Sequence, residues 1–367
     1  MIKVLHYAPG FRNGGIESRL LDWYRNTDRS KIQYVLVKLN NIDDTENMRE
    51  FKKLGGIHYN LPPLNATNLL MFPTRIKKIL IEEKIDIVHV HNPISGLFVL
   101  RESKRLGVKC RILHSRTTDY LPTEKNKLFK NVLRHFTPNY ANHFFACSIE
   151  AGIWGCGEDR KDEIVVIKNG IQDEKFIFSN ETRNKIREEL NIQDKIVVGT
   201  IGRLSHQKNL PYLLKLFTDL SMRESRYVLL IVGDGNRSII PDYFGGNQLP
   251  NNIVLVGNKK NVWDYYMAFD VFCSCSLYEG FGTTAIEAQA TGLPTILSKA
   301  FPEVVALTHF VKRIGIQEEN IKDWINAIMQ YSGKRYPKEG MEAVVKNGYS
   351  ASTVAKDLQE FYMSHAF

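Results

Sequence analysis

The chain has 367 residues, more than one ordinary hydrophobic core supports, so its length predicts two domains. A hydrophobic content of 43% and a charged content of 24% are typical of a globular protein, and no run reaches the roughly 18 apolar residues of a membrane-spanning helix. The five cysteines form no C-x-x-C pair, which argues against a cysteine metal site and favours a reducing compartment.

The net charge of +9 is unevenly distributed. Residues 1–150 hold 24 Lys and Arg against 14 Asp and Glu, whereas residues 191–367 hold 18 against 17. The basic excess is densest over residues 101–134, and it predicts either contact with an anionic membrane or a merely solvated basic face. Nucleic acid is not expected as a partner, because no zinc-finger, RNA-binding or helix-turn-helix signature accompanies the charge.

The first apolar run, residues 2–8, has no basic segment before it and no cleavage site after it, so we interpret it as a strand and not as a signal peptide. We therefore expect a cytoplasmic protein, with peripheral attachment to the inner face of the cell membrane left open.

Short apolar runs alternate with helical patterns along the whole chain, which is typical of βαβ units with parallel sheets. The alternation restarts after residue 191, so we expect an α/β fold with two Rossmann-like, doubly wound domains, over residues 1–170 and 171–348, and a C-terminal amphipathic helix over 349–367. The expected strands are 3–7, 34–39, 85–90, 110–114, 143–147 and 164–167 in the first domain, and 196–201, 227–232, 253–256, 270–274 and 294–298 in the second.

Three sparse signals occur in the first domain. Gly14 and Gly15 follow the first strand and open a helix, a corner that suits an anion, although the pattern is not the dinucleotide fingerprint G-x-G-x-x-G. His89 and His91 alternate at a strand end, but no third ligand is near in sequence, so we expect no metal site and no metal cofactor. His114 ends the next strand and is followed by Ser115 and Arg116.

The second domain carries denser motifs. Arg203, Lys208 and Asn209 lie on the loop that follows the strand 196–201, where an Arg and a Lys together suit a diphosphate. Gly257 and Asn258 end a later strand. Asp234, between Gly233 and Gly235, is expected to shape a turn.

The most informative stretch is residues 276–294, S-L-Y-E-G-F-G-T-T-A-I-E-A-Q-A-T-G-L-P. Glu279 stands in the loop after a buried strand, where ligands bind open α/β sheets. Glu287 lies about one turn into the next helix, and the glycines 280 and 282 offer backbone amides at its start. Two carboxylates at this corner suit a polyol with hydroxyl groups to donate.

These segments, in this order, resemble the family 4 glycosyltransferases, the large retaining group with the GT-B fold of two Rossmann-like domains facing a cleft. Glu279 and Glu287 match the E-x7-E motif of that family, and 202–209 matches its G-R-x-x-x-x-K-N segment. The relatives it most resembles come from bacterial exopolysaccharide and capsule clusters. The resemblance implies a nucleotide-sugar donor, with UDP-sugars favoured, and a saccharide or lipid-linked saccharide acceptor.

The resemblance also implies the role of each residue. In the donor half, Arg203 and Lys208 hold the diphosphate, Glu279 holds the sugar and Glu287 holds the ribose. Further donor contacts are implied for Asn209, Gly257, Asn258, Gly280, Phe281, Gly282 and Thr283. In the other half, Gly14 and Gly15 approach the distal phosphate, and His114 touches the donor sugar or the acceptor. Many members carry a second histidine where this chain has Arg116, which puts that role in doubt.

Arg203, Lys208, Glu279 and His114 are therefore the candidates for catalysis, which the resemblance implies is a front-face attack with the leaving phosphate accepting the proton. No general base can be named. Two alternatives stay open: an epimerase or hydrolase of sugar nucleotides on the same fold, and a non-catalytic protein that binds a nucleotide sugar. The missing G-x-G-x-x-G argues against a nicotinamide dehydrogenase.

Overall fold

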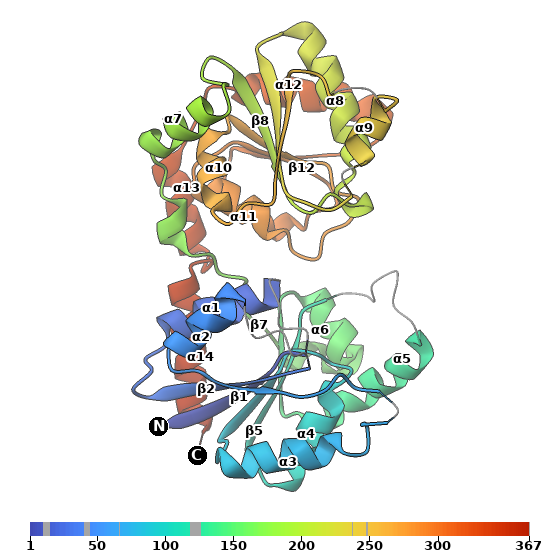
Figure 1. Cartoon of the computed structure of the whole chain (residues 1–367), viewed down its shortest axis with the longest axis vertical. Helices are drawn as coiled ribbons and strands as arrows, with labels where there is room; N and C mark the ends of the chain where they lie inside the picture. Colours follow the sequence, from blue (N-terminus) through green and yellow to red (C-terminus); the bar gives the residue numbers. More distant parts are fainter. Residues whose placement is uncertain are drawn as a thin grey trace. The chain divides into compact units, whose positions relative to one another are not determined.

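The computed structural model describes residues 1–9, 15–39, 45–65, 67–117, 126–236, 238–246 and 249–366. The chain folds as two compact units (Figure 1). Unit 1 comprises Met1–Gly170 and Ala351–Phe367, and unit 2 comprises Ile171–Ser350. The last helix therefore belongs to unit 1, although it follows unit 2 in the sequence.

Unit 1 is built on a parallel sheet of seven strands in the order β3-β2-β1-β4-β5-β6-β7. The central strands are almost continuously buried because helices cover both of their faces. The chain reverses direction across the sheet between β1 and β4, which makes this pair the topological switch point. The strands are β1 Ile2–Tyr7, β2 Ile32–Lys38, β3 Ile57–Asn60, β4 Ile87–Val90, β5 Cys110–Ser115, β6 His143–Ala146 and β7 Ile164–Val166.

Helices α1, α2 and α14 cover one face of this sheet, and α3 and α4 cover the other (Figure 1). Helix α14 packs against α1 and buries Val354, Leu358 and Tyr362 in the same core as Trp23. The helices of unit 1 are α1 Gly15–Asn26, α2 Glu46–Lys53, α3 Phe72–Glu82, α4 Gly96–Arg105, α5 Lys127–Phe136, α6 Ile149–Cys156 and α14 Ala351–His365.

Unit 2 repeats the same plan with six parallel strands in the order β10-β9-β8-β11-β12-β13. Its switch point lies between β8 and β11. The predicted pair of doubly wound parallel sheets is thus confirmed, although the edge strands β3 and β13 were not predicted. The strands are β8 Ile196–Ile201, β9 Tyr227–Val232, β10 Ile253–Gly257, β11 Val271–Ser274, β12 Thr295–Ser298 and β13 Val311–Ile314.

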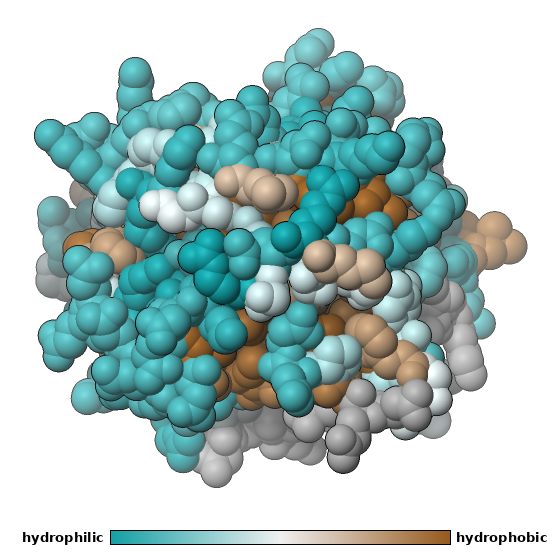
Figure 2. Space-filling model, turned by 90° about the horizontal axis from the view of Figure 1, so that it is seen from above, coloured by the Kyte–Doolittle hydropathy of each residue, from teal (hydrophilic) through white to brown (hydrophobic). Residues whose placement is uncertain are grey.

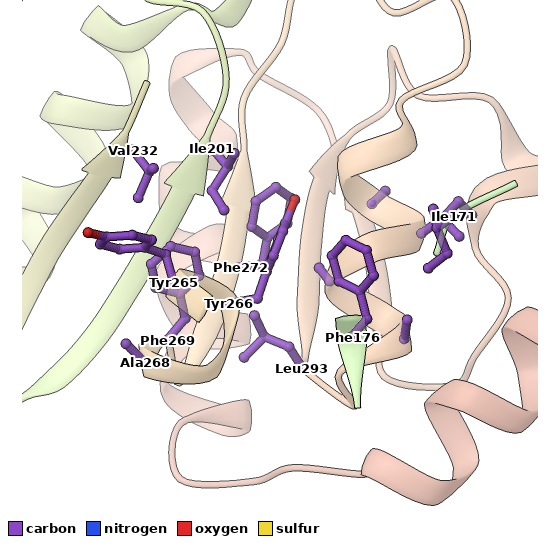
Figure 3. Packing of buried hydrophobic residues seen from close by; sticks show 14 of the residues in the cluster. Ile171, Phe176, Ile201, Val232, Tyr265, Tyr266, Ala268, Phe269, Phe272 and Leu293 are labelled. Carbon is purple, nitrogen blue, oxygen red and sulfur yellow. The ribbon is translucent and has the colours of Figure 1, made fainter. Parts of the chain in front are cut away.

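The core of unit 2 on one side of the sheet is rich in aromatic rings (Figure 3). Tyr266 from α10 lies beside Phe272 of β11, with ring centroids 5.8 Å apart, and Phe176 packs on the other side of Tyr266. The helices of unit 2 are α7 Asn180–Glu189, α8 Leu210–Arg223, α9 Ile239–Tyr243, α10 Val262–Ala268, α11 Thr283–Ala290, α12 Ile321–Tyr331 and α13 Pro337–Lys346.

The face of the molecule seen from above is mainly hydrophilic, and its hydrophobic residues form separate patches between polar ones (Figure 2). Among the described helices, none combines the length and the apolar character that crossing a bilayer would require.

Candidate active site

The loops that follow β8 and β11 meet at the switch point of unit 2, and they bring Lys208 and Glu279 together. Lys208 Nζ donates to Glu279 Oε1 at 2.6 Å, and both side chains are largely shielded from solvent. Ser276 Oγ donates to the same carboxylate oxygen at 2.8 Å. Within the described residues no partner is found for the second oxygen, Oε2, so Glu279 keeps one acceptor for a ligand.

Two glycines make this corner possible. A Cβ on Gly202, whose φ is +153°, would stand 2.8 Å from Cε of Lys208, so the lysine reaches Glu279 across a residue that has no side chain. Gly282 caps α11 with φ +85°, and a Cβ there would meet the ring of Phe301 at 2.4 Å. The backbone amides at the start of α11 consequently open beside Glu279.

Arg203 lies on the same loop as Lys208 and is exposed. In the part of the chain that the structure describes, no acidic side chain pairs with its guanidinium. Asn209 adopts the left-handed conformation at φ +49° and begins α8, a turn that asparagine tolerates well. Gly257 closes β10 with φ +71°, and Asn258 after it is exposed. These groups line the carboxyl edge of the sheet of unit 2.

The segment 280–283 is divided between the core and the surface. Gly280 is exposed, whereas the ring of Phe281 is buried against Tyr349, with centroids 5.5 Å apart. Phe281 can therefore offer a ligand only its backbone. Thr283 is half-buried at the first position of α11.

Glu287 is held in place by a residue that the sequence did not reveal. The hydroxyl of Tyr266 donates to Glu287 Oε2 at 2.8 Å, and Tyr266 is fully buried. Burial first, and the neighbouring carboxylate second, raise the pKa of Tyr266 well above its ordinary value, so the phenol keeps its proton and remains a donor. The sequence contains one signal for Tyr266: it is an aromatic residue in α10, the helix just before β11 and the E-x7-E stretch.

The switch point of unit 1 carries a cluster of four buried histidines. His6 of β1 pairs in register with His89 of β4, and His91 and His114 complete the group. His89 Nε2 lies 2.9 Å from His114 Nδ1, and His6 Nδ1 lies 3.0 Å from His91 Nε2. His114 was predicted as a site residue from the sequence, whereas no pattern in the sequence pointed to His6.

Burial is the main cause that lowers the pKa values in this cluster. It lowers the pKa of His6 to about 3, and it lowers the pKa values of His89, His91 and His114 well below the ordinary 6.5. The guanidinium of Arg116 adds to each shift. All four imidazoles are therefore neutral near pH 7, and each has one donor and one acceptor nitrogen.

Arg116 follows β5 and contacts both Trp23 and His91. Its guanidinium lies over the ring of Trp23 at 4.7 Å, and its Nε donates to His91 Nδ1 at 3.3 Å. Arg116 is therefore partly buried and packed against the ring of Trp23. Trp23 also stacks on His114, with centroids 6.0 Å apart.

Three of these histidines, His6, His89 and His91, lie close enough for one nitrogen of each to share a metal ion. Their nitrogens already bond to one another, to His114 and to the Tyr362 hydroxyl, and a permanent cation, Arg116, contacts His91. A divalent ion would have to break these bonds beside a positive charge. The arrangement favours hydrogen-bonded imidazoles.

Gly14 lies outside the described residues, as does most of the loop after Thr117. Gly15 is the first residue of α1, directly after the undescribed segment. Gly15 and His114 belong to unit 1, whereas Arg203, Lys208, Glu279 and Glu287 belong to unit 2.

Helix α5 is the most exposed of the described α-helices of unit 1. It has no buried residue, and an apolar stripe of Leu128, Phe129, Val132 and Phe136 is 82%, 56%, 47% and 51% exposed. Lys127, Lys130 and Arg134 flank this stripe. Phe129 and Phe136 therefore do not pack inside unit 1.

Both halves of the chain match family models of glycosyltransferases. Residues 13–175 match the model described as Glycosyltransferase Family 4, and residues 182–350 match the model described as Glycosyl transferases group 1. EpsF of Bacillus subtilis (strain 168), named as a candidate glycosyltransferase, is 28% identical over 359 residues, covering 95% of this chain and 93% of EpsF.

A UDP-Gal:α-D-GlcNAc-diphosphoundecaprenol α-1,3-galactosyltransferase of Escherichia coli is 28% identical over 267 residues, which are 69% of this chain and 68% of that enzyme. Among solved structures, HepE of Anabaena in complex with UDP superposes with a TM-score of 0.79 at 16% identity, covering 99% of this chain and 100% of HepE. At that identity, the superposition establishes the shared fold.

Proposed function

The chain belongs to the family 4 type of glycosyltransferases, and from this premise we propose that it transfers a sugar from a UDP-sugar to a saccharide or lipid-linked saccharide, with retention of configuration. The observation that carries this proposal is the Lys208–Glu279 pair beside the exposed Arg203. The choice of UDP is supported by the UDP bound to HepE, and the lipid-linked acceptor by the substrate in the name of the Escherichia coli relative.

In this proposal the groups of unit 2 bind the donor. Arg203 and Lys208 neutralise the diphosphate as it departs, with the amides at the start of α11 adding partial positive charge. Glu279 accepts a hydrogen bond from a sugar hydroxyl at Oε2, while Ser276 and Lys208 hold Oε1. Glu287 accepts from the ribose, oriented by Tyr266.

The groups of unit 1 serve the reaction centre. His114 contacts a sugar hydroxyl, and the backbone at Gly14 and Gly15 approaches the distal phosphate. The departing phosphate accepts the proton of the attacking hydroxyl, which gives retention without a protein base. No divalent metal is required in this scheme, so activity should survive a chelator; activity that a chelator abolishes and manganese restores would contradict it.

The acceptor side is proposed to reach an anionic membrane through α5. Its exposed apolar stripe and flanking basic residues are the two features that interfacial helices combine. The basic excess of residues 101–134 adds electrostatic attraction to anionic lipid. A transferase for surface polysaccharide would meet its lipid-linked substrate at this surface.

The test begins with a panel of sugar nucleotides and their effect on thermal unfolding, because a ligand that binds the native state raises the melting temperature. The stabilising nucleotide sugar is then incubated with and without candidate acceptors. Formation of a glycosylated acceptor with the donor's anomeric configuration supports the proposal. Release of free sugar or epimerised nucleotide sugar that no acceptor changes would favour a hydrolase or an epimerase.

A further inference from the structure

The two loops of the candidate active site are joined to each other at Gln207. The backbone amide of Leu277 donates to the Gln207 carbonyl at 2.8 Å, and Gln207 Nε2 donates to the Tyr278 carbonyl at 2.9 Å. We call these two bonds the Gln207 clamp. Gln207 stands directly before Lys208 in the chain. Tyr278 stands directly before Glu279, so the clamp joins the two loops beside both members of the ion pair.

The segment 277–280, which carries Glu279, receives little support from its own side chains. Leu277 is 36% exposed and Tyr278 is 52% exposed, so neither side chain is anchored in the core of unit 2. Gly280 has no side chain, and a Cβ at that position would meet no atom within 4 Å. The Gln207 clamp therefore restrains a stretch of backbone that side-chain packing does not.

The orientation of the Glu279 carboxylate depends on the spacing of the two loops. Lys208 Nζ and Ser276 Oγ both donate to Oε1 of Glu279, at 2.6 Å and 2.8 Å. The carbonyl of Ser276 is itself held by Ser298 Oγ at 2.6 Å, which ties this loop to β12. Because Lys208 and Ser276 come from different loops, Oε1 receives both bonds only while the loops keep their spacing. The Gln207 clamp sets that spacing next to the pair.

We infer that Gln207 is a positioning residue for the transfer reaction: its side chain holds the two loops at the spacing at which Lys208 and Glu279 reach one donor molecule. The inference rests on the proposed function, in which Lys208 binds the diphosphate and Glu279 binds a sugar hydroxyl. A nucleotide sugar engages both residues at once, so a fixed spacing lowers the cost of ordering the site. Gln207 stands at an unspecified position of the G-R-x-x-x-x-K-N segment, so no motif pointed to it.

The first measurement needs no ligand. Gln207→Met keeps the length of the side chain and removes its donor, and Gln207→Glu places a carboxylate, which cannot donate, against the Tyr278 carbonyl. Hydrogen exchange of the full-length protein should become faster over residues 276–283 in both variants, and it should not change in β8 and β11. Gln330→Met is the matched control, because Gln330 is an exposed glutamine of unit 2 on α12. Unchanged exchange over 276–283 in both Gln207 variants would overturn the inference.

The second measurement compares two ligands by titration calorimetry: UDP, and the UDP-sugar that stabilises the protein in the thermal screen. UDP has no sugar, so in the proposed function it engages Lys208 but not Glu279. Gln207→Met should raise the Kd of the UDP-sugar about fivefold, as expected for one hydrogen bond, and should change the Kd of UDP by less than about twofold. An equal rise in both Kd values would mean that Gln207 only supports the fold of the site, and it would overturn the positioning role.

A double-mutant cycle tests whether Gln207 acts through Glu279. In a Glu279→Ala background, Gln207→Met should have no further effect on the Kd of the UDP-sugar, because the residue that it positions is gone. A full effect of Gln207→Met in that background would overturn the inference. If the wild-type protein binds no sugar nucleotide, the proposed function fails, and the hydrogen exchange over 276–283 then decides by itself whether Gln207 holds the two loops together.

Discussion

The two units share one strand order and place their candidate groups at the same topological position, yet the chemistry at the two positions is opposite. In unit 1 the switch point holds four neutral, buried imidazoles. In unit 2 it holds an ion pair near the surface and an exposed arginine. The fold therefore decides where the candidate groups of each unit lie, while the residues decide which kind of chemical group each unit can bind.

The difference follows from the cost of burying charge. A diphosphate is doubly charged and needs cations, and unit 2 offers two kinds: the exposed Arg203, and Lys208, whose charge is balanced by Glu279. Sugar hydroxyls are neutral, and neutral imidazoles, each with one donor and one acceptor nitrogen, can bind them without carrying a charge themselves. The comparison predicts that the units respond differently to pH and to the loss of single side chains.

Acid should unfold unit 1 before unit 2. The folded-state pKa of each clustered histidine lies below the unfolded value of about 6.5. Below that pH the unfolded chain binds protons that the folded cluster excludes, so each histidine lowers the free energy of unfolding by about 1.4 kcal/mol per pH unit, down to its folded pKa, about 3 for His6. The two histidines of unit 2, His206 and His309, are exposed.

Hydrogen exchange at pH 7 and at about pH 5.5, corrected for the intrinsic rate, resolves the two units in the full chain. Peptides from β1, β4 and β5 should lose protection on acidification, and those from β8 and β11 should keep it. Equal loss in both units would mean that the histidine cluster does not control the acid stability of unit 1.

Removal of the charges proposed to bind the diphosphate should give the largest effect on the reaction itself. Arg203→Ala or Lys208→Ala should reduce kcat/KM by a factor on the order of 10² or more, because each removes a cation from the developing charge of the leaving group. Lys195→Ala, another cation of unit 2, is the control. Steady-state kinetics with the stabilising nucleotide sugar measures both, and turnover near the wild-type rate in Arg203→Ala would refute the assignment.

How much of the fold and of the candidate site the sequence could predict depends on how far apart in the sequence the contacting residues lie. The interior strands of each sheet can be predicted from their apolar runs. A motif such as 279–287 can also be predicted, because its two glutamates lie close together in the sequence. The edge strands β3 (I-H-Y-N) and β13 (V-K-R-I) escaped because polar residues interrupt them, which an edge position tolerates, whereas the apolar edge strands β7 and β10 were predicted. His6 escaped because a buried histidine within a strand has no distinguishing neighbour in sequence. The Tyr362–His89 bond spans 273 residues, so no local pattern could reveal it.

A third prediction uses the charge difference between the units. Helix α5 should bind vesicles that contain phosphatidylglycerol and should not bind pure phosphatidylcholine vesicles, and salt should weaken the binding. Lys127→Glu with Lys130→Glu should weaken it by at least about 1 kcal/mol for each residue. Phe129→Gln with Phe136→Gln tests the apolar stripe.

Co-sedimentation measures this binding, with Met222→Gln as the control because Met222 is 79% exposed on a helix of unit 2. If the Met222 variant loses as much vesicle binding as the α5 variants do, the binding is nonspecific adhesion. No binding at low salt would rule out α5 as a docking helix.

The smallest expected effect concerns a feature that the two units share. In each unit, a buried tyrosine on a helix orients a residue at or near the candidate site. Tyr362 does so for His89, and Tyr266 does so for Glu287. Tyr266→Phe removes one hydrogen bond to a carboxylate proposed to bind the ribose, a contact present before and during the reaction. The KM for the donor should therefore rise about three- to tenfold with kcat unchanged. Tyr265→Phe, its neighbour on α10, should change neither constant. A fall in kcat at constant KM would place Glu287 at the reaction centre instead of at the ribose.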